Sequence, residues 1–555
     1  MVPLVEKEGS KINLLDNYTY KIYSRILKSS KSRKVKVVQG ETLLSSLTPI
    51  PKVENPDFRI EKIYKINYPY TFARILFDTK NFEYYYEAIE PPLSSKLSAI
   101  LKEVYSSLNQ TLKFEWYLKT QAEKEQYLTE SVRKFIESRM IKVSDMDLER
   151  IFYYVKRDFI KYQKIDPLIN DENVEDISCD GVNIPIYIYH REYGSIKTNI
   201  TFNDDNELNS FIVYIGQKCM KQISVSDPIL DGTTPEGHRV QATYSREVTT
   251  RGGTFTIRRF KEKPFTPTDL IKYGTASPEM VAYLWLGVEL GESMIVIGGP
   301  ASGKTSTLNS IAIFIPPASK IVSIEDTREI NLPHQNWIPG TTRSGVGEKS
   351  IAGKASGEID MYDLVRAALR QRPRYIIVGE VRGKETYTMF QAMATGHTTY
   401  STMHAESVKA MVNRLENPPI GTPRILMTAL NNVIIQTQVK VKDELVRRIK
   451  EIVEIVGFEP ETNELITNVV FEWDPKKDRF IFKGHSYLFD KIINLKNWTH
   501  DDMDQEFERR INVIKYLDKK NITDFRDIWK IITDYYRDPK ETMERIMKDL
   551  SQENE

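Results

Sequence analysis

The spacing of apolar positions changes along the first half of the chain and predicts helices followed by a sheet. Between residues 121 and 163, apolar side chains recur at the period of an amphipathic helix; they are Leu128, Val132, Phe135, Ile136 and Met140. Residues 176–202 alternate apolar and polar side chains and predict short strands. The next expected elements are a helix at about 206–221 and strands at 238–244 and 253–260.

Short, mainly apolar runs replace this alternation in the second half. The runs are Met294–Ile297, Ile321–Ile324 and Tyr375–Val378, and segments with helical spacing separate them. A helix is expected to begin at Ser277, because this residue suits an N-cap and a proline follows it. Strands that are buried on both faces read as continuous apolar runs. The second half is therefore predicted to be α/β, with a mostly parallel sheet between helices.

These patterns divide the 555 residues into five parts. The segment Lys261–Pro267 is charged and broken by prolines, so it marks the main boundary. The last part has helical spacing and is expected to form a helical cap or a partner surface. The parts are a variable, partly basic extension (1–55), an α+β domain (56–260), a linker (261–275), an α/β core (276–470) and a helical C-terminal region (471–555).

Composition narrows the class of protein. Hydrophobic residues make up 40% and charged residues 28%, which is typical of large globular cores. The net charge of +1 argues against nucleic acid as a partner. Cys179 and Cys219 have no C-x-x-C partner, so we expect neither a zinc site nor a disulfide framework. The scarcity of cysteine fits a protein of the reducing cytosol. We find no signal peptide and no uncharged run long enough to cross a membrane, so we expect a cytoplasmic or peripheral protein.

The extension contains a basic run, Lys28–Lys36. Such a run is typical of a solvated face. The alternative is a docking site for anionic lipid or for an acidic partner. The sequence leaves both interpretations open.

The run Met294–Ile297 leads into a glycine-rich loop with the spacing G-x-x-x-x-G-K-[ST]. The N–H groups of such a loop wrap a polyphosphate, and the following helix adds the positive end of its dipole. Lys304 is expected to reach the β- and γ-phosphates, and the Thr305 hydroxyl to bind Mg²⁺. ATP with Mg²⁺ is therefore predicted, surrounded by Gly298, Gly299, Pro300, Ala301, Ser302, Gly303, Lys304, Thr305 and Ser306.

Two acidic side chains follow apolar runs of the second half. Glu325 ends one run and precedes Asp326, and Glu380 follows Gly379 at the end of another. Ligands of open α/β sheets bind beyond the carboxyl ends of the strands, so both acids are expected beside the loop. Gly379 stands where many P-loop proteins have a metal-binding aspartate, so Glu380 is expected to act on the water shell of Mg²⁺ or on the attacking water. For Glu325 and Asp326 the alternative is a structural loop cap.

Two of the seven histidines, His397 and His404, flank a segment rich in threonine and serine. Their separation of seven positions does not suit a helical metal pair. We expect a loop that returns to the nucleotide, with His397 beside it and His404 sensing or polarising the γ-phosphate. A purely structural histidine is the alternative.

Arginines are dense just before the main boundary. A guanidinium that reaches ATP from another domain or subunit acts as an arginine finger. Each of these arginines alone is typical of an exposed strand, but the set of five favours an arginine finger among them. The set consists of Arg239, Arg246, Arg251, Arg258 and Arg259.

Together these segments resemble the type II/type IV secretion ATPase superfamily. The resemblance covers about residues 140–480 and rests on four boxes in the order of the family: the P-loop, Val322–Asp326, Ile376–Arg382 and Gly396–Ala405. Further matches resemble the archaeal branch, which serves type IV pili and the archaellum; they are Val174–Gly181, Phe255–Phe260 and Val470–Pro475. The first 55 residues match nothing in the family.

The resemblance implies a RecA-like P-loop NTPase C-terminal domain, a smaller α+β N-terminal domain, and a homohexamer with ATP between the two domains. It implies Glu325 as the catalytic carboxylate and Glu380 as the residue that positions the metal, through water, and the attacking water. Of the arginines, Arg239 and Arg258 are expected to complete the site. The implied partner is a polytopic membrane platform protein, with anionic lipid as a further expected contact at the cytoplasmic side of the membrane.

The predicted function is a hexameric ATPase that drives the assembly or rotation of an archaeal type IV pilus-like filament, or protein secretion. An alternative of the same fold is a DNA-translocating or conjugation ATPase, which needs a DNA-binding surface. A non-catalytic scaffold is a third reading, and the set of Lys304, Glu325 and Glu380 argues against it. The sequence does not distinguish extension, retraction and rotation.

Overall fold

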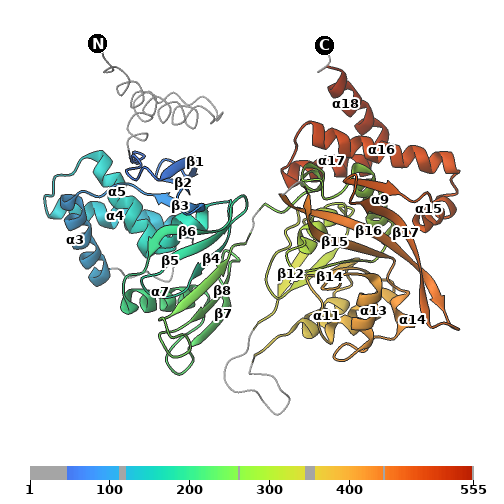
Figure 1. Ribbon diagram of the computed structural model, residues 1–555, viewed down its shortest axis with the longest axis horizontal. Helices are drawn as coiled ribbons and strands as arrows, with labels where there is room; N and C mark the ends of the chain where they lie inside the picture. The colour runs from blue at the N-terminus through green and yellow to red at the C-terminus, as the bar shows by residue number, and fades with distance from the viewer. Residues whose placement is uncertain (1–46, 112–119, 261–262, 344–356, 442–443, 553–555) are drawn as a thin grey trace, which may run out of the picture. The chain divides into compact units, whose positions relative to one another are not determined.

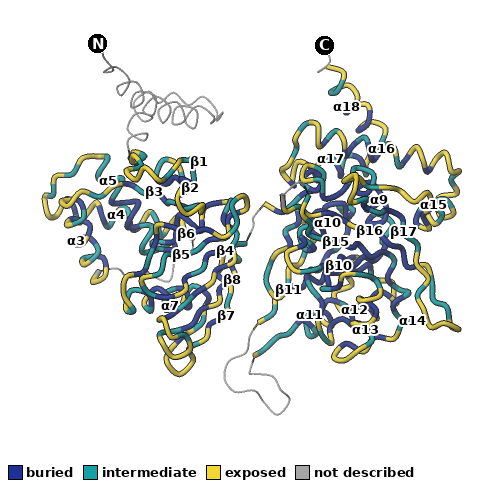
Figure 2. Tube along the Cα trace, viewed as in Figure 1, coloured by how far each residue is buried: buried dark blue, intermediate teal, exposed yellow. Residues whose placement is uncertain are grey.

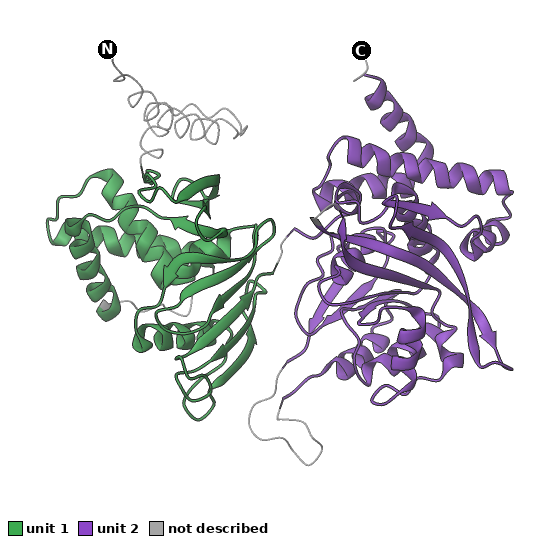
Figure 3. Cartoon of the chain, in the orientation of Figure 1, with its two compact units in different colours: residues 1–260 green, residues 261–555 purple. Residues whose placement is uncertain are grey.

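The chain folds into two compact units, residues 1–260 and 261–555 (Figure 3). The structure is a computed structural model, shown in Figure 1, and it describes residues 47–111, 120–260, 263–343, 357–441 and 444–552. The basic run Lys28–Lys36 lies outside the described residues.

The first unit is built on a nine-stranded sheet in the order β1-β2-β3-β6-β5-β4-β9-β8-β7. Every neighbouring pair is antiparallel except β3 and β6, which are parallel. The strands are β1 (Phe58–Asn67), β2 (Thr71–Asp78), β3 (Glu83–Ile89), β4 (Val174–Cys179), β5 (Pro185–His190), β6 (Gly194–Thr201), β7 (Ile229–Thr233), β8 (Arg239–Thr243) and β9 (Thr254–Arg258).

The helices of this unit divide the segment that was expected to be helical. Residues 121–163 form α4 (Gln121–Ser138) and α5 (Asp145–Phe159), separated where Met140 adopts a positive φ of 52°. Ser144 then caps α5 with its side chain. Leu128, Val132 and Ile136 are buried as predicted, but Met140 is 88% exposed and lies outside the core. The other helices are α3 (Ser95–Thr111), η1 (Gln163–Ile165), α6 (Asp166–Asn170) and α7 (Asp205–Lys218).

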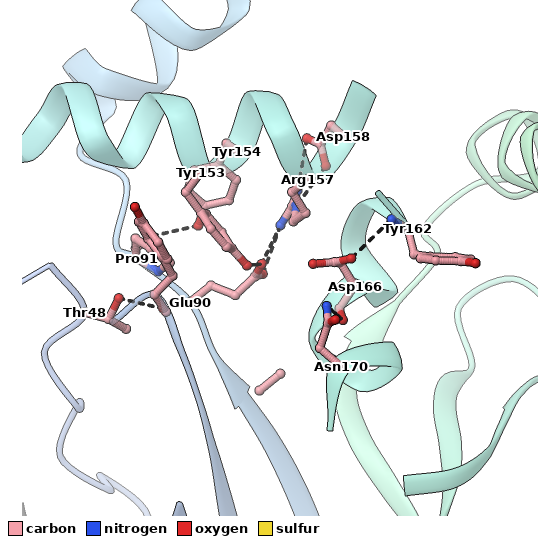
Figure 4. Close-up of polar contacts among 12 residues, drawn as sticks. Thr48, Glu90, Pro91, Tyr153, Tyr154, Arg157, Asp158, Tyr162, Asp166 and Asn170 are labelled. Atoms are coloured by element: carbon pink, nitrogen blue, oxygen red, sulfur yellow. Dashed lines mark hydrogen bonds and ion pairs between the residues drawn. The ribbon is translucent and has the colours of Figure 1, made fainter. Parts of the chain in front are cut away.

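A half-buried polar cluster joins α5 to the segment that follows β3 (Figure 4). The Arg157 guanidinium donates to both carboxylate oxygens of Glu90, at 2.8 and 3.0 Å, and also to Asp158. The Tyr153 hydroxyl donates to the same Glu90 at 2.6 Å. Charge-assisted and bidentate bonds of this kind fix geometry, so the cluster fastens α5 to the end of β3.

The second unit is built on another nine-stranded sheet, in the order β12-β11-β13-β14-β10-β15-β16-β17-β18. The first six strands are parallel, and the pairs from β15 to β18 are antiparallel. The strands are β10 (Met294–Gly298), β11 (Ile321–Glu325), β12 (Trp337–Thr341), β13 (Tyr375–Val378), β14 (Thr398–Met403), β15 (Asn432–Val441), β16 (Glu444–Glu459), β17 (Glu464–Asp474) and β18 (Arg479–Phe482).

Helices cover both faces of this sheet (Figure 1). One face packs against α9 (Pro278–Leu290), α10 (Lys304–Ala312), α15 (Tyr487–Lys496), α16 (His500–Lys519), α17 (Phe525–Arg537) and α18 (Pro539–Ser551). The other packs against α11 (Met361–Arg370), α12 (Glu385–Ala394), α13 (Val408–Glu416) and α14 (Arg424–Met427). The central strands are therefore buried along their length (Figure 2). This unit is a RecA-like α/β fold, and the first unit is a smaller α+β fold, as the resemblance implied.

Two of the expected segments differ from the observed elements. The expected linker, 261–275, contains helix α8 (Pro267–Lys272), whose N-cap Thr266 forms a capping box with Asp269. The expected start of the helical C-terminal region at residue 471 falls inside β17, and β18 follows before the helices begin. The strands continue because β16, β17 and β18 form an antiparallel meander at the edge of the sheet.

The C-terminal helices are joined to the α/β core by a buried cation. Arg510 of α16 is 2% exposed and pairs with Glu289 of α9 and with Glu506 one turn away. Its guanidinium also lies over the ring of Trp285, 4.7 Å from the ring centroid. A buried charge is tolerated only when it is paired, so these contacts belong to one cooperative cluster.

Candidate nucleotide-binding and hydrolysis site

The glycine-rich loop connects the buried strand β10 to helix α10. Two of its glycines are required, one by close packing and the other by its backbone conformation. A Cβ at Gly298 would lie 2.2 Å from the Gln436 carbonyl oxygen and 2.7 Å from Ser302 Oγ. Gly303, the N-cap of α10, has a φ of +93°, which disfavours any residue with a side chain. The loop backbone can therefore lie against the sheet only with glycine at positions 298 and 303.

Lys304 begins α10 and points back into the loop. Its ammonium group donates to the Gly299 carbonyl at 2.8 Å and lies 3.4 Å from Nδ1 of His404. The residue is 8% exposed, and burial lowers the pKa of Lys304 although the nearby Glu380 acts to raise it. Thr305 and Ser306 follow in the first turn of the helix, where free N–H groups attract anions. The loop thus offers a cation and a helix N-terminus to one anionic ligand.

The order of the strands brings the expected acids to the same edge of the sheet as the loop. β10 pairs with β14, β14 with β13, and β13 with β11, all in parallel. Across the sheet, the carboxyl ends of β10, β14, β13 and β11 are followed by Lys304, His404, Glu380 and Glu325 respectively. This arrangement agrees with the expectation that the acids lie beside the loop.

Glu380 lies among positively charged neighbours. Oε2 accepts a hydrogen bond from Arg382, and Oε1 lies 3.0 Å from Nε2 of His404 without meeting hydrogen-bond geometry. Burial acts to raise the pKa of Glu380, but the Arg382 guanidinium and the Lys304 ammonium lower it. Burial and the Lys304 charge lower the pKa of His404. Glu380 is therefore ionised and His404 neutral near pH 7.

Glu325 ends β11 and is almost fully buried, at 2% exposure. Oε1 accepts the backbone N–H groups of Glu329 and Ile330 at 2.8 and 2.9 Å, whereas Oε2 is buried with no hydrogen-bond partner among the described residues. Burial raises the pKa of Glu325 to about 8, in spite of these two bonds. A buried carboxyl with a raised pKa and an unpaired oxygen is typical of functional sites.

The residues present suit Mg²⁺ held through water. Magnesium is commonly bound by one or two oxygen side chains together with phosphates and waters. The Thr305 hydroxyl lies in the first turn of α10, and the buried Oε1 of Glu380 accepts no hydrogen bond from the described residues. Within the described ranges, no group of three or more His, Cys, Asp or Glu side chains forms a metal site by itself.

The prediction for His397 is wrong in its geometry. Residues 398–403 are not a loop but strand β14, and His397 precedes this strand whereas His404 follows it. A strand rises about 3.3 Å per residue, so the two histidines lie at opposite edges of the sheet, about 20 Å apart. His397 instead lies 3.4 Å from Thr395 Oγ1. It does not belong to the site of its own unit.

Arg239 and Arg258 are direct partners in the ladder between β8 and β9. Opposed residues of an antiparallel pair share one face of the sheet. Both side chains are well exposed, at 44% and 62%, and pair with Asp231 and Asp176 respectively. Arg246 pairs with Asp205, and Arg259 donates to backbone carbonyls of its own unit.

Sequence reasoning missed three polar side chains at the loop edge. Arg382 bonds to Glu380, Arg414 of α13 donates to the His404 carbonyl at 2.9 Å, and Arg447 of β16 donates to the Ala301 carbonyl at 2.9 Å. Arg382 lies two positions after Glu380, so the run Ile376–Arg382 contained that signal. Arg447 lies 146 positions from its partner, and no local pattern reveals the contact.

Comparison with known proteins places most of the chain in one family. Residues 161–470 match the model described as type II/IV secretion system protein, and residues 477–552 match PilB3-like, C-terminal. An uncharacterized protein of Methanocaldococcus jannaschii is 38% identical over 75% of this chain and 75% of its own length. The type IV secretion system protein PtlH of Bordetella pertussis is 26% identical over 44% of this chain and 80% of its own. The structure of the Legionella pneumophila ATPase DotB is 18% identical, covers 65% of this chain and 91% of its own, and has a TM-score of 0.37.

None of the helices in the described part of the chain is both long and apolar enough to cross a membrane.

Proposed function

Because the chain belongs to the type II/IV secretion system protein family, we propose that it is an ATPase that converts ATP hydrolysis into work on a membrane-bound secretion or filament machine. The observation that carries the proposal is the common sheet edge of Lys304, Glu380 and Glu325. A phosphate-binding cation, an ionised carboxylate and a buried carboxyl with a free oxygen are the groups that hydrolysis of a phosphoanhydride requires.

The loop and Lys304 bind the phosphates. The N–H groups of the loop and of the first turn of α10 surround the β- and γ-phosphates, and the Lys304 ammonium exchanges its bond to Gly299 for one to phosphate oxygen. The exchange keeps a buried cation paired throughout. Thr305 and Glu380 would hold Mg²⁺, which supplies positive charge to the phosphates when it is bound.

Glu325 acts on the attacking water. Its Oε1 is fixed by two backbone N–H groups, so Oε2 has a defined direction and is free to accept a hydrogen bond from water. When the water oxygen bonds to the γ-phosphorus, the bond between that phosphorus and the bridging oxygen breaks. The water proton passes to Glu325 in its ionised form, which the raised pKa of about 8 makes the minor form at pH 7 in the nucleotide-free protein. Neutral His404 can donate a hydrogen bond to a phosphate oxygen while Arg414 holds its backbone.

The quaternary part of the proposal is a homohexamer in which Arg239 and Arg258 complete the site. Their shared face and exposed guanidinium groups suit a contact with the charge that develops on the γ-phosphate. The proposed partner is a polytopic platform protein of an archaeal type IV pilus or archaellum machine, with anionic lipid as a further contact. The proposed location is the cytoplasmic side of the membrane. The alternative of the same fold is translocation of DNA.

The test is ATP turnover by the full chain and by Lys304→Ala, with and without vesicles of anionic lipid. The proposal expects slow release of phosphate that rises with oligomer formation and with lipid, and at least a hundredfold loss in the variant. Hydrolysis by Lys304→Ala at the native rate would sink the proposal. Turnover that rises with DNA in a salt-dependent way would instead support the DNA-translocating alternative.

A further inference from the structure

Arg447 reaches the phosphate-binding loop from a strand far away in the sequence. It lies on β16 opposite Gln438 of β15, and its Nε donates to the Ala301 carbonyl oxygen at 2.9 Å. The stem of the side chain follows the loop further, because a Cβ at Gly303 would lie 3.1 Å from Cδ of Arg447. The guanidinium therefore contacts the outer side of the loop at its centre.

The neighbouring residue shows that this orientation is particular to Arg447. Successive side chains of a strand point to opposite faces. Arg448 is buried on the other face, where it donates to both carboxylate oxygens of Asp478 and to the Tyr273 carbonyl. Arg448 therefore packs and bonds in the interior of the unit, whereas Arg447 contacts the loop.

The contacted carbonyl determines where a phosphate donor points. A trans peptide is planar, so the Ala301 C=O and the Ser302 N–H point in opposite directions. Arg447 binds the carbonyl on the outer side of the loop, which directs the Ser302 N–H toward the inner side. Among the described residues, this N–H has no hydrogen-bond acceptor. A cation on the carbonyl also polarises the amide and strengthens the N–H as a donor.

The composition of the loop makes the Ser302 N–H more important for phosphate binding. Pro300 has no N–H, so the loop lacks one of the donors that a P-loop of other sequence could offer. Ala301 has a positive φ of 55°, an uncommon conformation for a residue with a side chain, and it needs support from outside the loop. The bond from Arg447 supplies that support at the strained residue itself.

We propose that Arg447 is a positioning residue for phosphate binding, which acts through the peptide between Ala301 and Ser302. The inference rests on the proposed function, since it assigns Arg447 a role in binding the nucleotide at the same loop. Arg447 makes ground-state binding tighter and does not take part in the chemical step.

The experiment compares Arg447→Ala, Arg447→Lys and Lys450→Ala in the full chain. Lys450 is an exposed cation of the same strand, paired with Glu451, so its removal changes the charge without touching the loop. The measurements are the Kd of ADP by calorimetry, KM and kcat for ATP, and the Tm without nucleotide.

We expect Arg447→Ala to weaken ADP binding and raise KM about five- to tenfold, with kcat within twofold of wild type and the nucleotide-free Tm unchanged. Arg447→Lys, which keeps one donor, should recover most of the affinity, and Lys450→Ala should behave as wild type. If Arg447→Ala does not fold, Arg447→Gln replaces it in the same comparison.

Two results would overturn the inference while leaving the proposed function intact. One is wild-type ADP affinity in Arg447→Ala; the other is an equal loss in Lys450→Ala, which would reduce the effect to general charge. Absence of ADP binding by the wild-type chain is a different outcome, because it would refute the proposed function and the inference together.

Discussion

Gly379 leaves the space that the Glu325 side chain occupies. A Cβ at Gly379 would lie 3.1 Å from Cγ of Glu325, and the Gly379 N–H donates to the Ile324 carbonyl at 2.8 Å. The glycine thus lies at the point where a strand end bearing Glu380 meets the strand end bearing Glu325. This contact explains why a small residue occupies the position where other P-loop proteins carry an acid.

Gly379→Ala should impair hydrolysis without unfolding the protein. The added methyl group pushes Glu325 by a few tenths of an ångström, and misplacement of a catalytic group strongly reduces the rate. We expect kcat to fall roughly tenfold or more while ADP affinity stays within twofold. The control is Gly457→Ala on β16, where the new Cβ would have ordinary contact at 3.7 Å. Equal kcat values in the two variants would contradict the role of this contact.

Glu325 should make the stability of the nucleotide-free protein depend on pH. Burial raises the pKa of Glu325 from 4.5 to about 8, so between these values the folded chain keeps a proton that the unfolded chain has lost. The contribution of Glu325 to stability is therefore full below pH 4.5 and declines as the pH rises toward 8.

Glu325→Gln removes this titration and keeps an oxygen for the two backbone N–H groups. Its free energy of unfolding, relative to wild type, should increase by about 1.4 kcal/mol per pH unit from pH 4.5 to 8 and then level off. Urea denaturation at pH 5, 6.5, 8 and 9 measures the difference. A difference that is independent of pH would show that the carboxyl is ionised in the folded protein.

The two histidines around β14 should differ in their effect on hydrolysis. His404 lies 3.0 Å from Glu380 and 3.4 Å from Lys304, whereas His397 lies at the opposite edge of the sheet. We expect His404→Ala to reduce kcat about tenfold and His397→Ala to have no effect on it. An equal loss in both variants would mean that His397 reaches a nucleotide of another subunit.

Arg510 should be a stability determinant of the second unit. It is buried between Glu289 and Glu506, and removal of one partner from a buried charge cluster costs about 3–5 kcal/mol. We expect Arg510→Met to lower the free energy of unfolding by this amount. Arg509→Ala, which removes a 36% exposed neighbour that pairs with the same Glu506, should change it by about 0.5 kcal/mol or less. Similar losses in both variants would rule out the buried cluster as the cause.

The α/β core and the loop were predictable because their signals are local. The runs that became β10, β11 and β13 are mainly apolar and buried along their length, since helices cover both faces of the sheet. Their carboxyl ends then located Glu325 and Glu380 by a general rule of parallel sheets.

Strands β1–β3 and the side chains around the loop were not predictable, for different reasons. β2 is buried along most of its length on both faces, including Arg74, so it shows neither alternation nor a purely apolar run. Arg447 depends on the register of β15 and β16 and on the distant Ala301. His397 was misplaced because a threonine-rich segment that reads as a loop is a buried strand.

The central claim is that Glu325 performs the chemistry at a nucleotide bound by Lys304. The most direct measurement is phosphate release from ATP by Glu325→Gln, together with its affinity for ATP. The account predicts a loss of turnover of at least a hundredfold with ATP affinity within about threefold of wild type, because the amide cannot take a proton from water. Hydrolysis by Glu325→Gln at the wild-type rate would contradict it.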